Sequence, residues 1–477
     1  MQLVGRIQER AIFNHCLRST ESKLIALYGR RRVGKTFLVR KHFDQQIVFE
    51  IAGLYNGEMK DQLQHFALAI TKKGWAEAAL YPPKSWKAAF DLLERYLDAI
   101  PHQRKKVIFL DELPWFDTPR SKFIMAFENF WNAYCTRRED IVCVICGSAA
   151  SWMLKKILKN KGGLHNRVSE KIRLKPFNLY ESEQFLNQKG ILWSRYDIAQ
   201  LYLSTGGIPF YLDSIRKGES VVQFIDRACF SKDGILRNEY TELFHSLFDN
   251  SERHYKIVET LYNKKEGLTR EEIIDKSGLP SGGTLSITID ELEESGFIET
   301  QIQNKKQKSK ALYKLVDHFT IFYLKFMKSN ATHINQKWGN IVKTQSWISW
   351  SGLAFERLCF AHLSQIIRAL RLEAIGYNAF PYVFKGEEDT VQIDMLIDRA
   401  DRIVNLCEIK FTKADFIIDT DYARQLRNKL QRISERPENK RKNIFLTMIT
   451  TFGVADNAYY KELVQAEIVL DDLFTSD

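Results

Sequence analysis

The sequence predicts a multidomain α/β protein, and three observations support this fold class. The chain has 477 residues, a length that fits about three domains rather than one core. Short apolar runs followed by polar turns, at 24–28, 107–110 and 141–146, are typical of buried parallel strands. An alternating apolar and polar pattern at 391–397 is typical of a strand with one face on a core.

The composition is that of a packed globular protein. Hydrophobic residues make up 45% and charged residues 27%, with only 24 Gly and 10 Pro, which excludes disordered and collagen-like chains. The net charge of +11 suits a polyanionic partner without establishing one. No stretch of about 18 apolar residues occurs, and the first residues lack the apolar core of a signal peptide. We therefore expect a cytoplasmic protein with no membrane partner.

The seven cysteines are scattered, which argues against a disulfide framework. Cys143 and Cys146 form a CxxC inside the apolar run 141–146. On a strand this spacing sends the two side chains to opposite faces, and no second CxxC follows. The pattern predicts buried core thiols rather than zinc or redox chemistry.

The first segment with a chemical signature follows the strand expected at 24–28 and reads G-x-x-x-x-G-K-T. A glycine loop of this kind points backbone N–H groups at phosphate oxygens, and the helix expected from Lys35 adds the positive end of its dipole. Lys35 would reach the β- and γ-phosphates, and the Thr36 hydroxyl would bind Mg²⁺. A plain strand-to-helix turn would not need the Lys-Thr pair. The predicted phosphate-binding residues are Gly29, Arg30, Arg31, Arg32, Val33, Gly34, Lys35 and Thr36.

Two further strand ends carry polar residues. The strand expected at 107–110 ends in Asp111, which can hold Mg²⁺, and Glu112, which can orient or deprotonate the attacking water. A strand followed by two acids is often only a solvated loop, but the phosphate-binding motif upstream favours the catalytic interpretation. The strand expected at 141–146 leads to Ser148, at the position of a polar sensor between Glu112 and the γ-phosphate. A Gly-Ser pair can also simply end a strand.

Together these residues resemble the P-loop ATPases of the AAA+/STAND group, and more closely their archaeal-type prokaryotic branch, in which the ATPase precedes a winged helix and a nuclease-like domain. Residues 3–9 resemble the adenine-side box of this family. The segment 206–212 resembles its G-x-P element in a helical lid, which would place Pro209 against the nucleotide; an ordinary helix stop is the alternative. The resemblance implies ATP and Mg²⁺ as cofactors.

Several arginines have roles that the sequence leaves open. Arg167 precedes the strand expected at 171–176, where AAA+ relatives carry an arginine that senses the γ-phosphate, and a surface arginine is the alternative. Arg30, Arg31 and Arg32 are expected to face solvent. They could also meet nucleic acid or a neighbouring subunit, and the latter would imply a homo-oligomer.

The middle of the chain has the element order of a winged helix-turn-helix. Helices are expected at 255–261, 270–276 and 285–292, followed by strands from 296 and at 312–315, with a lysine-rich turn at 305–310. The third helix is acidic in its C-terminal half, which disfavours contact with phosphates. We therefore favour a scaffold that docks between domains over a DNA reader.

Charged residues converge in the C-terminal region. If the strands at 391–397 and 403–411 form a hairpin centred on Asp401, Asp394 lies across from Glu408. Lys410 then projects from the same face as Glu408, two residues along the strand. The alternative is an exposed sheet face that these three side chains cover with salt bridges.

This D-(turn)-E-x-K pattern resembles the PD-(D/E)xK nuclease superfamily. The resemblance implies that Asp394 and Glu408 bind a divalent metal and that Lys410 stabilises developing negative charge. Glu356, in a helix expected to open at Gly352, fits the additional acid of this superfamily. Further along, Tyr422 and Gln425 fit its polar follow-on helix. The superfamily's proline before the first Asp is absent, and Gln392-Ile393 stand in its place.

The sequence thus predicts four domains: a P-loop, AAA+-like ATPase core (1–178), a helical lid (179–250), a winged helix (251–318) and a restriction-endonuclease-like α/β domain (335–477). The first hypothesis is an ATPase whose nucleotide state controls a metal-dependent nuclease acting on nucleic acid, with DNA favoured. The second is a STAND-like switch whose C-terminal domain binds DNA or a protein partner without cutting.

Overall fold

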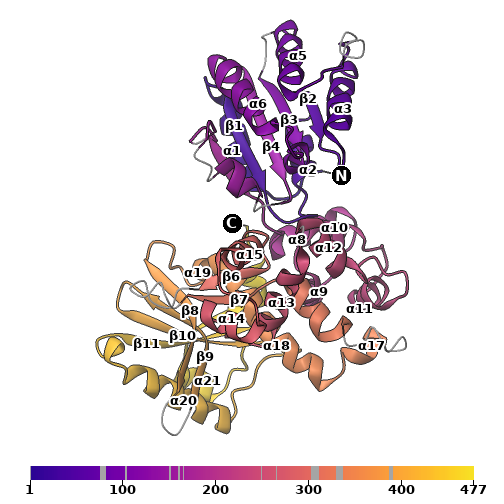
Figure 1. The fold of residues 1–477 in the computed structure, drawn as a ribbon. Helices are drawn as coiled ribbons and strands as arrows, with labels where there is room; N and C mark the ends of the chain where they lie inside the picture. Colours follow the sequence, from indigo (N-terminus) through magenta and orange to yellow (C-terminus); the bar gives the residue numbers. More distant parts are fainter. Residues whose placement is uncertain are drawn as a thin grey trace. The chain divides into compact units, whose positions relative to one another are not determined.

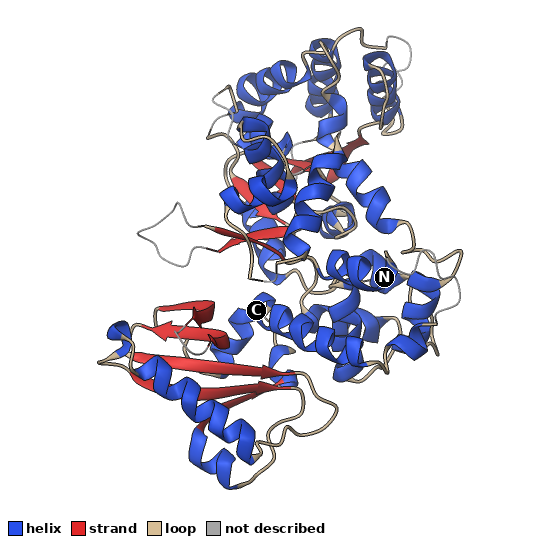
Figure 2. Ribbon diagram, turned by 60° about the horizontal axis from the view of Figure 1, so that its bottom comes forward, coloured by secondary structure: helices blue, strands red, loops and turns tan. Residues whose placement is uncertain are grey.

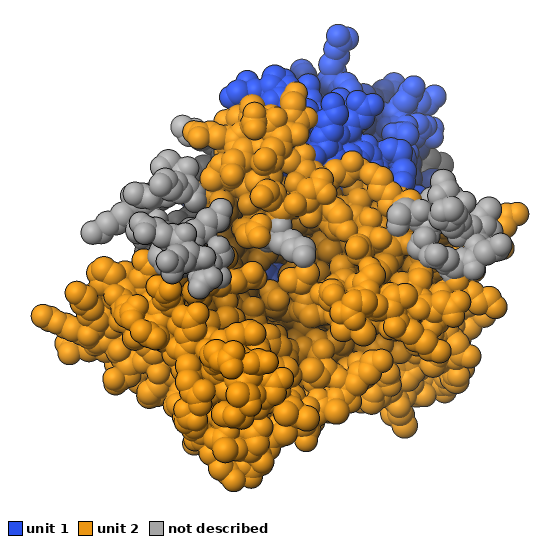
Figure 3. Space-filling model, turned by 90° about the horizontal axis from the view of Figure 1, so that it is seen from below, with its two compact units in different colours: residues 1–176, 241–257, 279–298 blue, residues 177–240, 258–278, 299–477 orange. Residues whose placement is uncertain are grey.

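The structure is a computed structural model, and the residues it describes fall into two compact units (Figure 3). The first unit comprises 1–176, 241–257 and 279–298, and the second 177–240, 258–278 and 299–477. No helix within the described residues is long and apolar enough to cross a membrane. The lysine-rich turn at 305–310 lies outside the described residues, which are 2–75, 82–101, 105–149, 152–158, 162–164, 166–248, 250–264, 266–301, 311–328, 337–385 and 390–476.

The first unit is built on a parallel five-stranded sheet with the order β2-β3-β4-β1-β5, of which β1 to β4 are labelled in Figure 1. β4 lies between β1 and β3, so the residues that follow β4 come between the loop after β1 and the end of β3. The central strands are buried along almost their whole length, as their apolar runs predict. The strands are β1 (Lys23–Tyr28), β2 (Ile47–Ala52), β3 (Lys106–Asp111), β4 (Ile141–Gly147) and β5 (Glu170–Arg173).

Helices pack on this sheet around an aromatic core. Phe66, Trp86, Phe90 and Phe123 have ring centroids within 4.8–6.2 Å of one another in successive pairs. Cys143 and Cys146 are buried in β4, and all seven cysteines are buried free thiols, as expected. The helices are α1 (Ile7–Arg18), α2 (Lys35–Phe43), α3 (Met59–Thr71), α5 (Trp86–Ala99) and α6 (Phe123–Asn129).

The region expected to be a winged helix contributes to both units. It forms α13 (Ser251–Tyr262), α14 (Arg270–Ser277), α15 (Gly283–Glu294), β6 (Ile298–Gln301) and β7 (Leu312–Leu315), in the order that the sequence predicts. β6 and β7 pair in a two-stranded sheet. Residues 241–257 and 279–298, which hold the start of α13 and all of α15, cluster with the first unit. The winged-helix assignment and the four domain boundaries stay predictions.

The helices of the second unit begin where the lid is expected. Gly207 is required there, because a Cβ at this position would lie 1.9 Å from the Phe177 carbonyl oxygen. The helices are α8 (Leu179–Gln188), α9 (Arg195–Thr205), α10 (Pro209–Asp213), α11 (Val221–Ile225) and, at the junction, α12 (Glu239–Leu247). After β7 follow α16 (His318–Phe322), α17 (Trp338–Ile341), α18 (Gln345–Ala361) and α19 (Leu363–Ala369).

The C-terminal part of the second unit is a five-stranded sheet with the order β12-β11-β10-β9-β8, shown in red with its helices in Figure 2. β10, β11 and β12 are parallel, whereas β8 and β9 are antiparallel to their neighbours. Leu426 and Ile433 of α20 belong to the same buried apolar cluster as Val404 and Leu406 of β10. The elements are β8 (Tyr377–Lys385), β9 (Thr390–Arg399), β10 (Ile403–Lys410), α20 (Thr420–Ser434), β11 (Asn443–Thr450), α21 (Ala458–Leu463) and β12 (Val464–Val469).

The hairpin of β9 and β10 has the register of a turn centred on Asp401, with pairs from Val404↔Asp398 to Cys407↔Met395. The alternation expected along 391–397 is interrupted, however. Phe380 pairs with Leu396 but Tyr382 pairs with Ile393, so β9 carries an irregularity at Asp394 and Met395. A bulge of this kind redirects a side chain at the point where it occurs.

Candidate functional site

The loop after β1 has the backbone of a phosphate-binding loop. Gly29 (φ 141°) and Gly34 (φ 91°) adopt positive φ angles that favour glycine. A Cβ on Gly29 would also lie 2.4 Å from the Leu174 carbonyl oxygen. Lys35 begins α2, and its Nζ donates to the carbonyl oxygens of Gly29 and Arg30, both at 2.9 Å. The ammonium group is therefore held within the loop that is expected to bind phosphate.

The two predicted magnesium ligands of the first unit lie together. The Thr36 hydroxyl donates to Asp111 Oδ2 at 2.6 Å, and the other oxygen of Asp111 accepts the N–H of Glu112 at 3.0 Å. A hydroxyl and a carboxylate at the start of α2 and the end of β3 are hard oxygen donors, the type that Mg²⁺ prefers. These residues fit a magnesium–nucleotide complex.

Ser148 lies on the predicted catalytic acid. Its backbone N–H and its hydroxyl both donate to Glu112 Oε2, at 3.1 Å and 2.8 Å. Glu112 itself has a left-handed backbone (φ 45°), which is uncommon outside glycine and is often found at functional sites. The order of strands explains this contact, because the end of β4 lies beside the end of β3.

Arg6 is a site residue that the sequence reasoning placed in the N-terminal box without a role of its own. Its guanidinium is 5% exposed and donates to the carbonyl oxygens of Val33 (3.1 Å) and Lys175 (2.8 Å). Arg6 thus fastens the phosphate-binding loop to the segment after β5. The signal available in the sequence was the Gly5-Arg6 pair before α1; in the structure both residues have positive φ.

The expectation that Arg30 faces solvent is wrong, whereas Arg31 and Arg32 are partly exposed. Arg30 is 4% exposed, and its guanidinium lies over the Phe297 ring, 5.2 Å from the centroid. Arg32 Nη2 lies 3.7 Å from Glu242 Oε2. Both partners belong to the parts of the first unit, 241–257 and 279–298, that follow the ATPase core by many residues in sequence. The phosphate-binding loop is therefore in direct contact with α12 and with the turn between α15 and β6.

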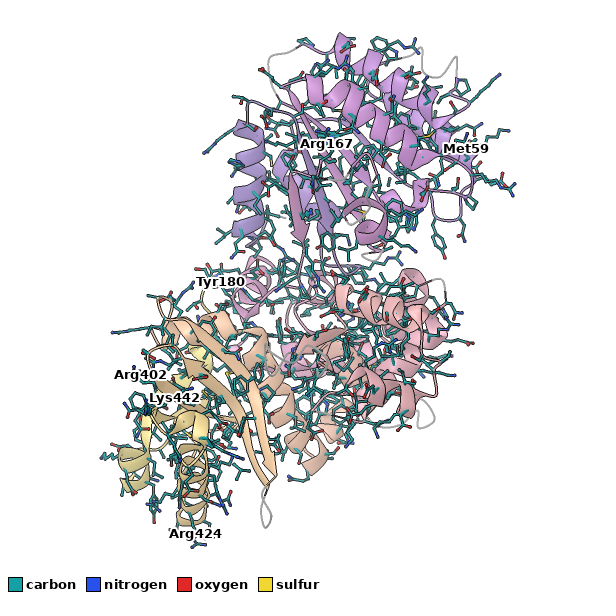
Figure 4. All side chains as sticks on the ribbon, turned by 60° about the vertical axis from the view of Figure 1, so that its left-hand side comes forward. Met59, Arg167, Tyr180, Arg402, Arg424 and Lys442 are labelled. Carbon is teal, nitrogen blue, oxygen red and sulfur yellow. The ribbon has the colours of Figure 1, made fainter. Side chains whose placement is uncertain are left out.

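The other two predicted nucleotide contacts stay predictions. Arg167, labelled in Figure 4, belongs to the exposed turn before β5 and is not paired to a carboxylate by any ion pair among the described residues. Pro209 occupies the first position of α10, where its fixed φ suits a helix start. It belongs to the second unit.

In the second unit, Asp394, Glu408 and Lys410 converge at one end of the sheet. Lys410 Nζ lies 3.6 Å from Glu408 Oε2 and 4.0 Å from Asp394 Oδ2. Asp394 Oδ2 also accepts the N–H of Ile409 at 2.8 Å, which anchors it across the hairpin at the irregularity in β9. The Glu408 side chain is buried, with 1% exposed.

α20 supplies two more groups to Glu408. The Tyr422 hydroxyl donates to Oε2 at 2.7 Å and Lys429 Nζ to Oε1 at 2.5 Å. Sequence reasoning had placed Tyr422 here, together with Gln425, which is instead exposed. It missed Lys429, although a spacing of seven residues puts Tyr422 and Lys429 on one face of a helix. Burial and the nearby Glu408 carboxylate raise the pKa of Tyr422 well above its ordinary range.

Glu356, on α18, is partly buried near this group. Burial, followed by the charge of Asp394, raises the pKa of Glu356 to about 7. Burial and the neighbouring Glu408 also raise the pKa of Asp394. Within the described residues, however, no three His, Cys, Asp or Glu side chains are placed to hold one metal ion together. That Glu356, Asp394 and Glu408 bind a metal ion therefore stays a prediction, and in the structure Tyr422 and Lys429 engage the two oxygens of Glu408.

The donor chemistry still fits a divalent cation at the pair formed by Asp394 and Glu408. Glu408 is buried and Asp394 is partly buried, and burial together with the nearby charge of Glu408 raises the pKa of Asp394. Cations already surround them, with Lys410 beside both and Lys429 on Glu408. A hard cation would replace the lysine contacts of Glu408 with metal coordination.

Comparisons with known proteins bear on the N-terminal half. Residues 3–215 match a family of ATPase domains found predominantly in Archaea. An uncharacterised protein of Methanocaldococcus jannaschii is 24% identical over 389 residues, which cover 81% of this chain and 82% of that protein. The alignment therefore extends beyond the ATPase domain.

Among solved structures, a Walker-type ATPase of Pyrococcus abyssi has a TM-score of 0.52 and 16% identity, covering 68% of this chain and 96% of its own. This similarity shows a shared fold. The ORC2 protein of Aeropyrum pernix, solved as ADPNP–ADP complexes, has a TM-score of 0.42 and 14% identity, with 72% and 96% covered.

Proposed function

Because residues 3–215 form an archaeal-type P-loop ATPase domain, we propose that this chain hydrolyses ATP and that its nucleotide state controls a metal-dependent, nuclease-like site in the C-terminal domain. In the ATPase domain, Lys35 binds the β- and γ-phosphates. Thr36 and Asp111 hold Mg²⁺, which neutralises charge on the phosphates. Glu112 positions and deprotonates the attacking water while Ser148 orients its carboxylate.

The contacts of the phosphate-binding loop support a route for this control. Lys35 donates to the carbonyl oxygen of Arg30, and the Arg30 side chain lies over Phe297. If Lys35 turns to bound phosphates, the carbonyl oxygen of Arg30 loses its hydrogen bond from Lys35. Arg30 is also the residue whose side chain lies over Phe297. Residues just after Phe297 form β6. A ligand controls a second site only if it binds two conformations with different affinity, and a loop that contacts both nucleotide and Phe297 allows this.

The observation that carries the nuclease-like part is the convergence of Asp394, Glu408 and Lys410 on the β9–β10 hairpin. Asp394 and Glu408 would hold the divalent ion, which supplies an activated water and polarises a phosphate when bound. Lys410 donates to the developing negative charge on the phosphate. With a net charge of +11, the chain suits a nucleic acid substrate, and DNA is the proposed one.

One observation favours the alternative, a STAND-like switch whose C-terminal domain binds nucleic acid or a protein without cutting. Both oxygens of Glu408 are engaged by α20, as in a purely structural buried ion pair. Such a pair would hold α20 on the sheet and leave no ligand for a metal.

Incubation of the full chain with linear, circular and single-stranded DNA, with and without ATP and Mg²⁺, distinguishes the two. Cleavage that requires Mg²⁺ and is lost in Asp394→Ala supports the nuclease. DNA binding that Asp394→Ala leaves intact, with no product in any lane, supports the switch. Asp401→Ala, in the exposed turn of the same hairpin, is the matched control and should cut as the wild type does.

A further inference from the structure

The C-terminal site contains one cation that the proposed chemistry does not use. Lys429 Nζ donates to Glu408 Oε1 at 2.5 Å, the shortest contact made to this carboxylate. Its side chain is 21% exposed, so it can reach solvent, whereas Glu408 is 1% exposed. Lys410, the lysine of the E-x-K pattern, lies farther away at 3.6 Å.

A buried carboxylate must be paired, because an isolated charge in the interior is costly. Glu408 has only Tyr422, Lys410 and Lys429 as polar partners among its described contacts. Of these, Lys429 alone approaches Oε1, and it is carried by a helix rather than by the hairpin that carries Glu408 and Asp394. Its flexible stem allows the ammonium to leave without moving the sheet.

We propose that Lys429 is a positioning residue that occupies the cation position at Glu408 and must be displaced when a divalent metal binds. The ammonium group thereby keeps Glu408 paired before the metal arrives, and it lowers the apparent affinity of the site for the metal. This inference rests on the proposed metal site at Asp394 and Glu408. It adds to that site a residue that competes with the ion.

The competition has a measurable size. A hydrogen bond to a charged group contributes about 1.5–3 kcal/mol, and each 1.4 kcal/mol is a factor of ten in affinity. Because Lys429 is partly exposed, its contribution belongs at the lower end of that range. Removal of the ammonium in Lys429→Met should therefore tighten divalent metal binding roughly tenfold.

The test titrates Mn²⁺ into the nucleotide-free full chain and follows the free ion by electron paramagnetic resonance, with Asp394→Asn as the background. The variants are Lys429→Met, Lys429→Arg, which keeps a cation, and Arg424→Met. Arg424→Met is the matched control because it removes a positive charge from the same helix. The Arg424 side chain, labelled in Figure 4, is 75% exposed. Thermal unfolding with and without Mn²⁺ shows that each variant folds.

The inference predicts that Lys429→Met binds Mn²⁺ about tenfold more tightly than the wild type, while Lys429→Arg and Arg424→Met do not. Mn²⁺ should also raise the melting temperature of Lys429→Met more than that of the wild type. If the wild type binds Mn²⁺ and Lys429→Met binds it equally or more weakly, the inference about Lys429 is wrong and the proposed metal site is still supported. If no protein binds more Mn²⁺ than Asp394→Asn, the proposed metal site itself is wrong.

Discussion

Lys35 is expected to contribute both to the stability of the loop and to the binding of ATP. Replacement of Lys35 by methionine tests these two contributions separately. Lys35 Nζ donates to two loop carbonyl oxygens at 2.9 Å, and the residue is 6% exposed. Methionine keeps the length of the side chain but leaves both carbonyl oxygens without this donor. Since hydrogen bonds to a charged group contribute about 1.5–3 kcal/mol, we expect the free energy of unfolding of the first unit to fall by about 2 kcal/mol.

The second contribution appears only with ligand. ATP at 100 times its Kd should raise the unfolding free energy of the wild type by about 2.7 kcal/mol, because it binds the folded state alone. At the same concentration Lys35→Met should gain almost nothing, since the charge that faces the β- and γ-phosphates is gone.

The assay is urea unfolding followed by circular dichroism, with and without MgATP. Lys41→Met is the matched control because Lys41 is an exposed lysine on the same helix, α2. It should unfold and respond to ATP as the wild type does. An ATP-induced gain in Lys35→Met equal to that of the wild type would refute the placement of phosphates in this loop.

Three further changes test other parts of the account. Glu112→Gln should still bind ATP but hydrolyse it about 10²–10⁴-fold more slowly in a phosphate-release assay, because the amide keeps the shape of the side chain but cannot act as a base. Turnover at the wild-type rate would mean that another residue activates the water. Burial lowers the pKa of His318 to about 3, so the imidazole stays neutral in the folded protein while it is protonated in the unfolded chain below pH 6.5. The protein should therefore keep its full stability above pH 6.5 and lose stability as the pH falls below that value. Between pH 7.5 and pH 5, wild type should lose about 2 kcal/mol more than His318→Gln in urea unfolding, and equal losses would contradict the buried neutral imidazole. Glu408→Gln should abolish DNA cleavage and leave ATPase turnover unchanged, and cleavage that survives would exclude Glu408 as a ligand.

The parts of the site that lie close together in sequence could be predicted. The apolar runs before Gly29, Asp111 and Ser148 are strands buried along all or almost all of their length, and such runs followed by polar residues are typical of parallel sheets. The hairpin register could be predicted as well, because a short turn centred on Asp401 determines which residues of β9 and β10 are paired.

Contacts between distant segments could not be predicted. The burial of Arg30 depends on Phe297, and no local pattern links an arginine in a glycine loop to an aromatic residue more than 250 positions later. In the sequence, Lys429 cannot be distinguished from the other cations of a basic helix, and only the fold shows that it contacts Glu408. The helix that carries Glu356 begins at Gln345 rather than Gly352, because Thr344 caps it through the N–H of Trp347.

The central claim is that the nucleotide state of the loop at 29–36 controls the site at Asp394 and Glu408. The most direct measurement compares Mg²⁺-dependent DNA cleavage by Glu112→Gln, which holds ATP, with cleavage by Lys35→Met, which does not bind it, at the same Mg²⁺ and ATP concentrations. The account predicts different cleavage rates for the two variants, and no cleavage when Asp394→Ala is added to either. Equal rates in both would mean that the two sites are only tethered and would contradict the claim.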